Sequence, residues 1–382
     1  MEYRRFGATD RLLSVFSLGL MRCTDSPILL AETIAAAWGI GINHWETAQA
    51  YGQSEVLLGQ ALQELALPRH RFFLTTKLTP MTGPETEQAL HRSLQRLQLS
   101  FVDAIAIHGI NQPQHLEMVL AEGGMLAVLK AAQRKGQIQH LGFSTHGPLD
   151  LILQAIDSGA FSFISLHYSL FFQRNQAAIQ RAAERDLGIF IISPADKGGL
   201  LHRPPDRLAH LCTPYTPLDL NYRFLLADPR ITTLSFGAAN PPELQVLDRI
   251  CDRTEPLTPQ EQEILHHLDR AAQDTLGTDR CSQCYACLPC PEGIHIPEVL
   301  RLRNLAIAYD MTAFGQYRYG MFENAGHWFP GRRGDRCTDC GDCLPRCPEA
   351  LNIPALLRDS HDRLKGKSRR RLWENEGLES RS

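Results

Sequence analysis

The chain of 382 residues has no long apolar run and no strong excess of charge of one sign. Its first ten residues, MEYRRFGATD, contain no apolar signal core, and no later stretch reaches the roughly 18 apolar residues of a membrane span. The net charge of −3 gives no reason to expect nucleic acid or an anionic membrane as a partner. We therefore expect a cytoplasmic protein that binds neither.

Cysteine is sparse through most of the sequence and concentrated near its end. Cys23, Cys212 and Cys251 are scattered, and we interpret each as a small buried hydrophobic residue. The other eight form two runs in the last hundred or so residues. The first run is Cys281-x-x-Cys284-x-x-Cys287-x-x-Cys290-Pro, and the second is Cys337-x-x-Cys340-x-x-Cys343-x-x-x-Cys347-Pro.

This spacing indicates iron–sulfur clusters. Three cysteines at a repeated two-residue gap, with a fourth before proline, are typical of 4Fe-4S ligation. Zinc usually takes separated C-x₂-C pairs, and disulfide frameworks suit small secreted domains, so both alternatives fit less well. In two-cluster ferredoxins the fourth cysteine of each run ligates the other cluster. The expected ligand sets are Cys281, Cys284, Cys287 and Cys347 for one cluster, and Cys337, Cys340, Cys343 and Cys290 for the other.

The two runs belong to an internal duplication. CPEGIHIPEVL follows the pattern of CPEALNIPALL, and helical segments begin near Pro297 and Pro354 after the respective runs. The long segment between the runs is also helical in pattern. These features favour an α-helical ferredoxin-like domain.

The first 250 residues alternate between strand-like and amphipathic helical segments. Eight such units predict a parallel (β/α)₈ barrel, an α/β fold. An open doubly wound sheet is the alternative, but no G-x-G-x-x-G follows the first strand. The predicted strands are 15–20, 42–47, 72–77, 102–107, 138–143, 161–166, 188–193 and 231–236.

The expected domain boundaries follow from these patterns. We expect the barrel at 1–256, a linker helix plus the ferredoxin-like domain at 257–362, and a polar tail at 363–382. The linker helix, 258–275, has Thr258 as its N-cap, Pro259 at its first position and Glu261 to complete a capping box.

Four residues near the strand ends are candidates for catalysis. Chemistry in such barrels occurs at the C-terminal ends of the strands. Glu46, Tyr51, Lys77 and His108 follow or end three neighbouring predicted strands. A phenol is a poor acid near neutral pH, but an adjacent ammonium group favours its ionised form. We expect a carboxylate to hold the lysine, and a histidine to bind a substrate oxygen.

With these residues placed, the first 250 residues resemble the aldo/keto reductase family. NHWETAQAYGQSEVLLGQAL resembles its signature, FFLTTK its lysine strand and AIAIHGI its histidine strand, while LGFSTHG, IISPADKGGLL and SFGAANPPEL resemble its cofactor-binding segments. The whole chain is similar to the branch with a C-terminal ferredoxin-like extension. The resemblance implies NADPH-dependent reduction of a small aldehyde or ketone, or the reverse reaction, with Tyr51 as proton donor. The implied cofactor residues are Met21, Ser144, Ser165, Ser193 and Gly237.

The sequence departs from the family pattern at four positions. Glu46 replaces the usual aspartate, and Ser165 aligns with a glutamine that binds the nicotinamide amide. Ile192 aligns with a stacking tyrosine, and Glu243 with an arginine for the 2′-phosphate. An acid is better suited to a ribose diol than to a phosphate. NADH therefore stays an alternative to NADPH.

Three functional hypotheses follow from joining such a barrel to two 4Fe-4S clusters. The first is a carbonyl reductase whose clusters are structural or sense oxidants. The second is an electron-transfer reductase fed by a ferredoxin or flavoprotein, because nicotinamides transfer two electrons as hydride and such clusters transfer one. The third is a non-catalytic nicotinamide-binding redox sensor.

Overall fold

The computed structural model describes residues 1–24 and 26–369, and the rest of the predicted polar tail, 370–382, lies outside the described residues. The chain forms two compact units. The first contains Met1–Pro194 and Tyr222–Pro256, and the second contains Ala195–Asn221 and Leu257–Ser382. The predicted boundary at residue 256 stays a prediction. Within the described residues, no helix is long and apolar enough to cross a membrane.

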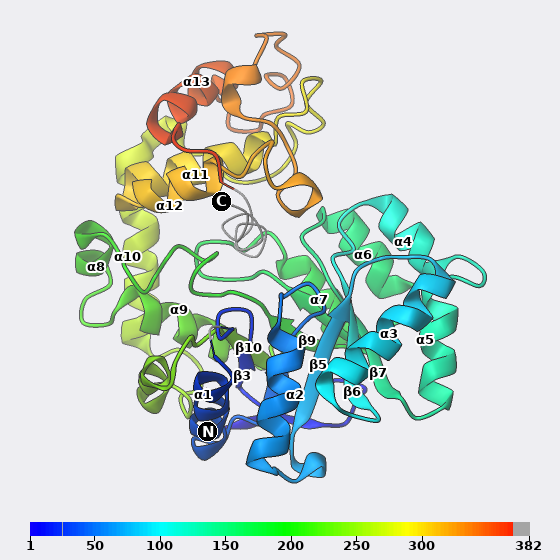
Figure 1. The fold of residues 1–382 in the computed structure, drawn as a ribbon. Helices are drawn as coiled ribbons and strands as arrows, with labels where there is room; N and C mark the ends of the chain where they lie inside the picture. Colours follow the sequence, from blue (N-terminus) through cyan, green and yellow to red (C-terminus); the bar gives the residue numbers. More distant parts are fainter. Residues whose placement is uncertain (25, 370–382) are drawn as a thin grey trace. The chain divides into compact units, whose positions relative to one another are not determined.

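The first unit is built on a closed parallel barrel, which confirms the predicted fold class (Figure 1). All eight predicted strands are present, and the first pairs with the last to close the barrel. In order around it they are β3 (Phe16–Gly19), β4 (His44–Glu46), β5 (Phe73–Leu78), β6 (Val102–His108), β7 (Ile138–Ser144), β8 (Phe163–Leu166), β9 (Gly188–Ile191) and β10 (Thr233–Phe236).

Helices alternate with these strands and lie around the barrel (Figure 1). Several have a proline in the first turn and a capping side chain, as in α3, where Thr82 and Glu85 form a capping box. The helices are α1 (Pro27–Gly39), α2 (Ser54–Leu65), α3 (Gly83–Leu97), α4 (Pro113–Leu120), α5 (Met125–Arg134), α6 (Leu149–Asp157), α7 (Gln176–Glu184) and α9 (Pro217–Leu226), with the 3₁₀ segments η1 (Arg69–Arg71) and η2 (Pro241–Arg249). Segment α9 crosses the division between the two units.

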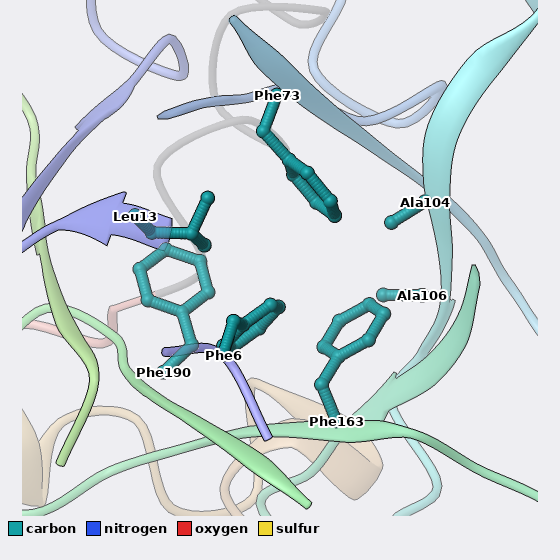
Figure 2. Packing of buried hydrophobic residues seen from close by; sticks show 7 residues of the cluster. All are labelled: Phe6, Leu13, Phe73, Ala104, Ala106, Phe163 and Phe190. Atoms are coloured by element: carbon teal, nitrogen blue, oxygen red, sulfur yellow. The ribbon is translucent and has the colours of Figure 1, made fainter. Parts of the chain in front are cut away.

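A short antiparallel hairpin, which the sequence did not predict, precedes the barrel. It consists of β1 (Tyr3–Arg5) and β2 (Leu12–Ser14). Phe6, which follows β1, packs among barrel phenylalanines, with ring centroids 5.2 Å from Phe163 and 6.0 Å from Phe73. Figure 2 shows these rings together with Leu13, Ala104, Ala106 and Phe190. The hairpin thus contributes directly to the barrel's hydrophobic core.

The second unit is helical, as expected for an α-helical ferredoxin-like domain. Its linker helix has the predicted N-terminus, because Thr258 caps it and forms a capping box with Glu261. Two later helices begin at Ile296 and Ile353, each with a proline in its first turn, which confirms the predicted pattern. The helices are α8 (Asp206–Leu211), α10 (Pro259–Leu276), α11 (Ile296–Tyr309), α12 (Thr312–Tyr319) and α13 (Ile353–Leu364), with η3 (Gly277–Asp279), η4 (Gly326–Trp328) and η5 (Gly334–Arg336).

Candidate active site and iron–sulfur sites

The four predicted catalytic residues come together at the C-terminal ends of neighbouring strands. Glu46 ends β4, Lys77 is the penultimate residue of β5, and His108 ends β6. Tyr51 lies in the loop after β4, and all four side chains are buried. Adjacent pairing of β4 with β5 and of β5 with β6 explains why residues far apart in sequence meet here.

Lys77 is the centre of this group. Its Nζ donates to the Tyr51 hydroxyl oxygen at 3.2 Å and to the Thr47 carbonyl oxygen at 3.0 Å. It also forms a buried ion pair with Glu46. An ammonium group has three donors, so these three oxygens fix its position. The lysine is thereby held charged beside the phenol oxygen.

His108 completes the group, and its ring lies next to that of Tyr51. The two ring centroids lie 5.6 Å apart, and the rings are nearly perpendicular at 86°. Lys77 Nζ lies 4.7 Å from the centroid of the same tyrosine ring. Tyr51 therefore contacts both a cationic side chain and an imidazole, an arrangement that can donate a proton to a bound oxygen and orient that oxygen.

Ser235 joins the site, although the sequence reasoning missed it. Its Oγ donates to Glu46 Oε1 at 3.3 Å from strand β10. Closure of the barrel brings β10 beside β3. In β3, a Cβ at Gly19 would lie only 2.8 Å from Ser235 Oγ and 3.0 Å from Glu46 Oε1. Glycine at this position therefore allows the serine and the glutamate to meet, and a glycine at a strand end was the available signal.

His44 lies beneath the site in β4 and is fully buried. Its Nδ1 lies 2.6 Å from Ser17 Oγ, and its Nε2 lies 2.9 Å from Thr75 Oγ1. Burial, with a smaller contribution from the charge of Lys77, lowers the pKa of His44 to about 3. This histidine is therefore neutral at ordinary pH. Its contacts with two buried hydroxyl groups indicate a structural role.

The predicted cofactor residues lie at or after the ends of other strands. Ser144 ends β7 and pairs in register with Ser165 of β8. Ser144 Oγ accepts a hydrogen bond from Gly109 N at 3.1 Å. The Ser165 hydroxyl is fully buried and has no hydrogen-bond partner among the described residues. A buried hydroxyl without a protein partner is available to hydrogen-bond a polar ligand group, such as a nicotinamide amide.

The remaining three cofactor candidates occupy loops. Met21 follows β3, Gly237 follows β10, and Ser193 follows β9. Ser193 has a left-handed backbone with φ of 49°, which non-glycine residues rarely adopt. Strain of this kind is often found at binding sites.

Arg22, next to Met21, was also missed by the sequence reasoning. Its Nη1 donates to the Gly237 carbonyl oxygen at 2.7 Å and to Glu243 Oε2 at 2.9 Å. Its Nη2 donates to Glu243 Oε1 at 3.2 Å, so the pair is bidentate. Glu243 is therefore held by a guanidinium group from the first strand's loop, and both charges are engaged with each other.

The structure groups the eight cysteines into two sets of four. One pocket is lined by Cys281, Cys284, Cys287 and Cys347, which we name the Cys281 quartet. A second pocket is lined by Cys290, Cys337, Cys340 and Cys343, the Cys337 quartet. Each quartet takes three thiols from one run and the fourth from the other. This is the interleaved grouping that the spacing predicted.

The chemistry of the thiols fits an iron–sulfur cluster. Burial, followed by the neighbouring Cys281, raises the pKa of Cys287 to about 12. Burial also raises the pKa of Cys343, with smaller contributions from Cys337, Cys290 and Cys340. Bound iron reverses this tendency, because a coordinating thiol is deprotonated by the cation. Within the described residues, no three Cys, His, Asp or Glu side chains converge as a single-ion site would require.

The duplication extends to the backbone of the two runs. Gln283 and Asp339 occupy equivalent positions and have φ of 60° and 58°. Tyr285 and Gly341 are likewise equivalent, with φ of 63° and 82°. Exposure repeats as well: the second cysteine of each run is exposed and the third is buried. The two quartets thus share one backbone design.

The fold and these two kinds of site define a (β/α)₈ oxidoreductase barrel joined to an iron–sulfur domain. Residues 17–221 match the aldo/keto reductase family, and residues 280–351 match the 4Fe-4S dicluster domain. The chain belongs to the aldo/keto reductase family and carries a 4Fe-4S dicluster domain. Family membership confirms the expected enzyme class, an aldo/keto reductase-type oxidoreductase.

Known proteins resemble mainly the barrel. An aldo-keto reductase of Mycolicibacterium smegmatis is 31% identical over 206 residues, which cover 51% of this chain and 67% of that protein. D-arabinose 1-dehydrogenase of Saccharomyces cerevisiae is 32% identical over 140 residues, 34% of this chain and 40% of that protein. The chain thus spans well under two thirds of the yeast protein's length.

Solved structures support the fold. An aldo-keto reductase from Bacillus halodurans superimposes with a TM-score of 0.61 at 20% identity, covering 70% of this chain and 95% of that chain. At this identity the likeness establishes the barrel fold alone.

Proposed function

We propose that the protein is an NAD(P)H-dependent carbonyl reductase in which Tyr51 donates a proton to the substrate oxygen. The observation that carries this proposal is the 3.2 Å hydrogen bond from Lys77 Nζ to the Tyr51 hydroxyl, inside a buried group at the strand ends. When bound, the nicotinamide supplies a hydride to the carbonyl carbon. The phenol supplies the proton, so one NAD(P)H and one proton convert a carbonyl to an alcohol.

Each residue of the group has a distinct role in this proposal. Tyr51 gives its proton to the carbonyl oxygen and regains one from solvent. Lys77 stabilises the phenolate that remains, because an adjacent cation favours the charged form. Glu46 holds Lys77 through the buried ion pair. His108 donates a hydrogen bond to the same substrate oxygen, which orients the carbonyl for hydride addition.

The residues that would hold the nicotinamide are Met21, Ser144, Ser165, Ser193 and Gly237. The unpartnered hydroxyl of Ser165 supports a polar contact in this region. Arg22 and Glu243 bear on the choice of cofactor, because the arginine is already engaged by a carboxylate. A carboxylate suits a ribose diol better than a 2′-phosphate, which keeps NADH as an alternative to NADPH.

Two 4Fe-4S clusters complete the proposal, one at each cysteine quartet. The grouping of four thiols around each pocket supports this number. A reducing compartment, the cytoplasm, suits free thiols and cluster ligands.

The test of the proposed acid is Tyr51→Phe. We expect kcat for carbonyl reduction to fall about 10²–10⁴-fold, the usual contribution of a general acid. The assays should include reduction of methylglyoxal and, in the reverse direction, oxidation of D-arabinose with NAD(P)⁺, because relatives are named for these two reactions. Tyr3→Phe is the matched control, since Tyr3 lies in β1 and is 44% exposed. Full turnover by Tyr51→Phe would refute the proposed acid.

A second candidate function rests on the dicluster domain itself. In that case a ferredoxin or flavoprotein supplies electrons one at a time through the part of the second unit that carries both quartets, from α10 to α13, which we name the cysteine unit. Carbonyl reduction would then require that donor in addition to a nicotinamide. Turnover with NAD(P)H alone, at a rate unchanged by reduced ferredoxin, would exclude this alternative.

A further inference from the structure

The two cysteine quartets share a backbone but differ in the groups that surround them. Reduction potentials of iron–sulfur clusters depend on cluster type, solvent exposure, hydrogen bonds to sulfur and nearby charge. The thiol ligands of the two sites are alike in number and in exposure. The exposed ligands Cys284 and Cys340 are equivalent, and the buried ligands Cys287 and Cys343 are each 7% exposed. Hydrogen bonding and charge are therefore left to distinguish the sites.

Hydrogen bonding to sulfur favours reduction at the Cys281 quartet. Gln283 Nε2 donates to Cys281 Sγ at 3.3 Å and to the Pro297 carbonyl oxygen at 3.0 Å, so the amide is held in place from two sides. The equivalent position in the second run is Asp339, whose side chain accepts a hydrogen bond from Arg358 Nη1 at 2.6 Å and has no N–H to donate. An N–H donated to sulfur stabilises the more negative, reduced form of a cluster. An adjacent carboxylate destabilises it.

Buried charge acts in the same direction. Arg301 in α11 donates to both carboxylate oxygens of Glu298, at 2.9 and 2.6 Å. Arg318 in α12 lies in the same buried group, with its guanidinium 4.2 Å from the centroid of the Phe329 ring. Both arginines act electrostatically on the buried carboxylate of Glu298, so two buried guanidinium groups lie near one carboxylate. Burial lowers the pKa of Arg318 to about 10, which still leaves it protonated at neutral pH.

Two neighbours of this buried group, Leu300 and Tyr285, line the Cys281 pocket. Leu300 is the residue before Arg301. Burial tends to lower the pKa of Arg301, but the Glu298 carboxylate holds it above its usual value, and Tyr285 adds a smaller effect of the same sign. In the second repeat Ala355 replaces Glu298, and the equivalent arginine, Arg358, is exposed and paired with Asp339 at 2.6 Å. A charge in a buried setting has a larger effect than one in water.

The other charged residues near the two pockets largely offset one another. Glu292 and Glu349 are equivalent in the duplication, and each lines one pocket. Asp342 and Arg346 both line the Cys337 pocket and carry opposite charges. Two differences between the sites remain. Gln283 near the first site is replaced by Asp339 near the second, and the buried arginines described above belong to the first repeat's surroundings.

We propose that the two cluster sites are unequal, and that the first electron entering the dicluster domain resides at the Cys281 quartet. One electron from a one-electron donor reduces that site, and no atom is transferred. If the electron enters at the Cys337 quartet, it moves to the Cys281 quartet, which oxidises the former and reduces the latter by one electron. This inference rests on the proposed occupancy of both quartets by 4Fe-4S clusters.

The test is an anaerobic redox titration of the full chain with dithionite, followed by electron paramagnetic resonance. We expect two separate one-electron waves. Gln283→Leu removes the donor and Gln283→Glu also adds charge, so both lower the upper wave, by about tenfold in the reduced-to-oxidised ratio, or ~59 mV. Asp339→Asn raises only the lower wave, and by less, because Asp339 is exposed and paired. Asp362→Asn, a change of the same charge near the far end of α13, moves neither wave.

Ligand variants assign the waves to the sites. Cys284→Ser should change the spectrum of the first-reduced cluster, and the matched Cys340→Ser that of the second. The reverse assignment, or a single unresolved wave in a chain that contains both clusters, would overturn the inference. Iron and sulfide analysis separates this failure from that of the proposed function, since too little iron for two clusters refutes the dicluster occupancy itself. Cluster content and circular dichroism of each variant identify loss of folding, and the Leu and Glu variants of Gln283 provide independent tests.

Discussion

The barrel site and the cysteine unit both bury charged side chains, but they balance them differently. At the strand ends, the ammonium of Lys77 faces the carboxylate of Glu46. In the cysteine unit, two buried arginines, Arg301 and Arg318, act on the buried carboxylate of Glu298. An unpaired buried charge is costly unless another group compensates it. The comparison indicates that the barrel site is complete by itself, whereas the cysteine unit is arranged for an anionic group, as a thiolate-ligated cluster is.

Removing iron should have the largest effect on stability, and this effect should be confined to the cysteine unit. Metal binding is coupled to folding, so chelation should lower the local stability of α11, α12 and α13 by several kcal/mol. Hydrogen exchange of the full chain, with and without chelator, measures this. Strands β5 and β6 serve as the internal control. Equal loss of protection in those strands would contradict the expectation that the effect is confined to the cysteine unit.

Lys77→Met should destabilise the barrel by about 3–5 kcal/mol, because it leaves Glu46 buried without its partner. The double variant Glu46→Gln/Lys77→Met should recover much of that loss. Exchange rates in β5 and β6 under mild denaturant report the change. If the double variant proves less stable than Lys77→Met, loss of the ion pair is not the cause of the destabilisation.

Acid should weaken the barrel through His44. The pKa of this histidine is about 3 in the folded protein and near 6.5 when unfolded. Between these values the unfolded chain binds a proton that the folded chain does not, so stability falls as pH drops below about 6.5. One such proton changes stability by about 1.4 kcal/mol per pH unit. His44→Asn should remove this slope in thermal unfolding between pH 7 and 5, and an unchanged slope would assign it to other groups.

Arg318→Met should have the smallest effect and the opposite sign to Lys77→Met. Replacing a buried charge by an apolar side chain of similar length is often neutral or stabilising. In iron-free protein we expect exchange in α12 to slow by about fivefold, near 1 kcal/mol. With clusters loaded, this gain should disappear. Faster exchange without iron would show that the arginine is compensated within the protein.

Much of this architecture could be predicted from sequence, because its signals are local. The eight strands are apolar runs, and the capping box of α10 lies within four consecutive residues, Thr258 to Glu261. The cysteine spacing predicted both quartets, since the thiols of each run are close in sequence. The four residues around Tyr51 were found because strand ends share one edge of a barrel.

The missed residues depend on contacts between distant segments. Ser235 reaches Glu46 only because β10 closes against β3. Arg22 meets Glu243 across loops from the first and last strands. The hairpin β1–β2 has strands of three residues, too short for a periodic pattern. Arg318 has an ordinary helical sequence context, and its burial becomes visible only after α11 and α12 pack together.

Because the two cysteine runs are interleaved, the two quartets gain their full sets of four cysteines in a fixed order during synthesis. The Cys281 quartet takes its fourth thiol from the later run, whereas the thiol that the Cys337 quartet takes from the other run, Cys290, is synthesised before its own three. The Cys337 quartet is complete once Cys343 leaves the ribosome, whereas the quartet that begins with Cys281 must wait for Cys347. The site whose first cysteine is made earliest is therefore the last to gain its full set of ligands.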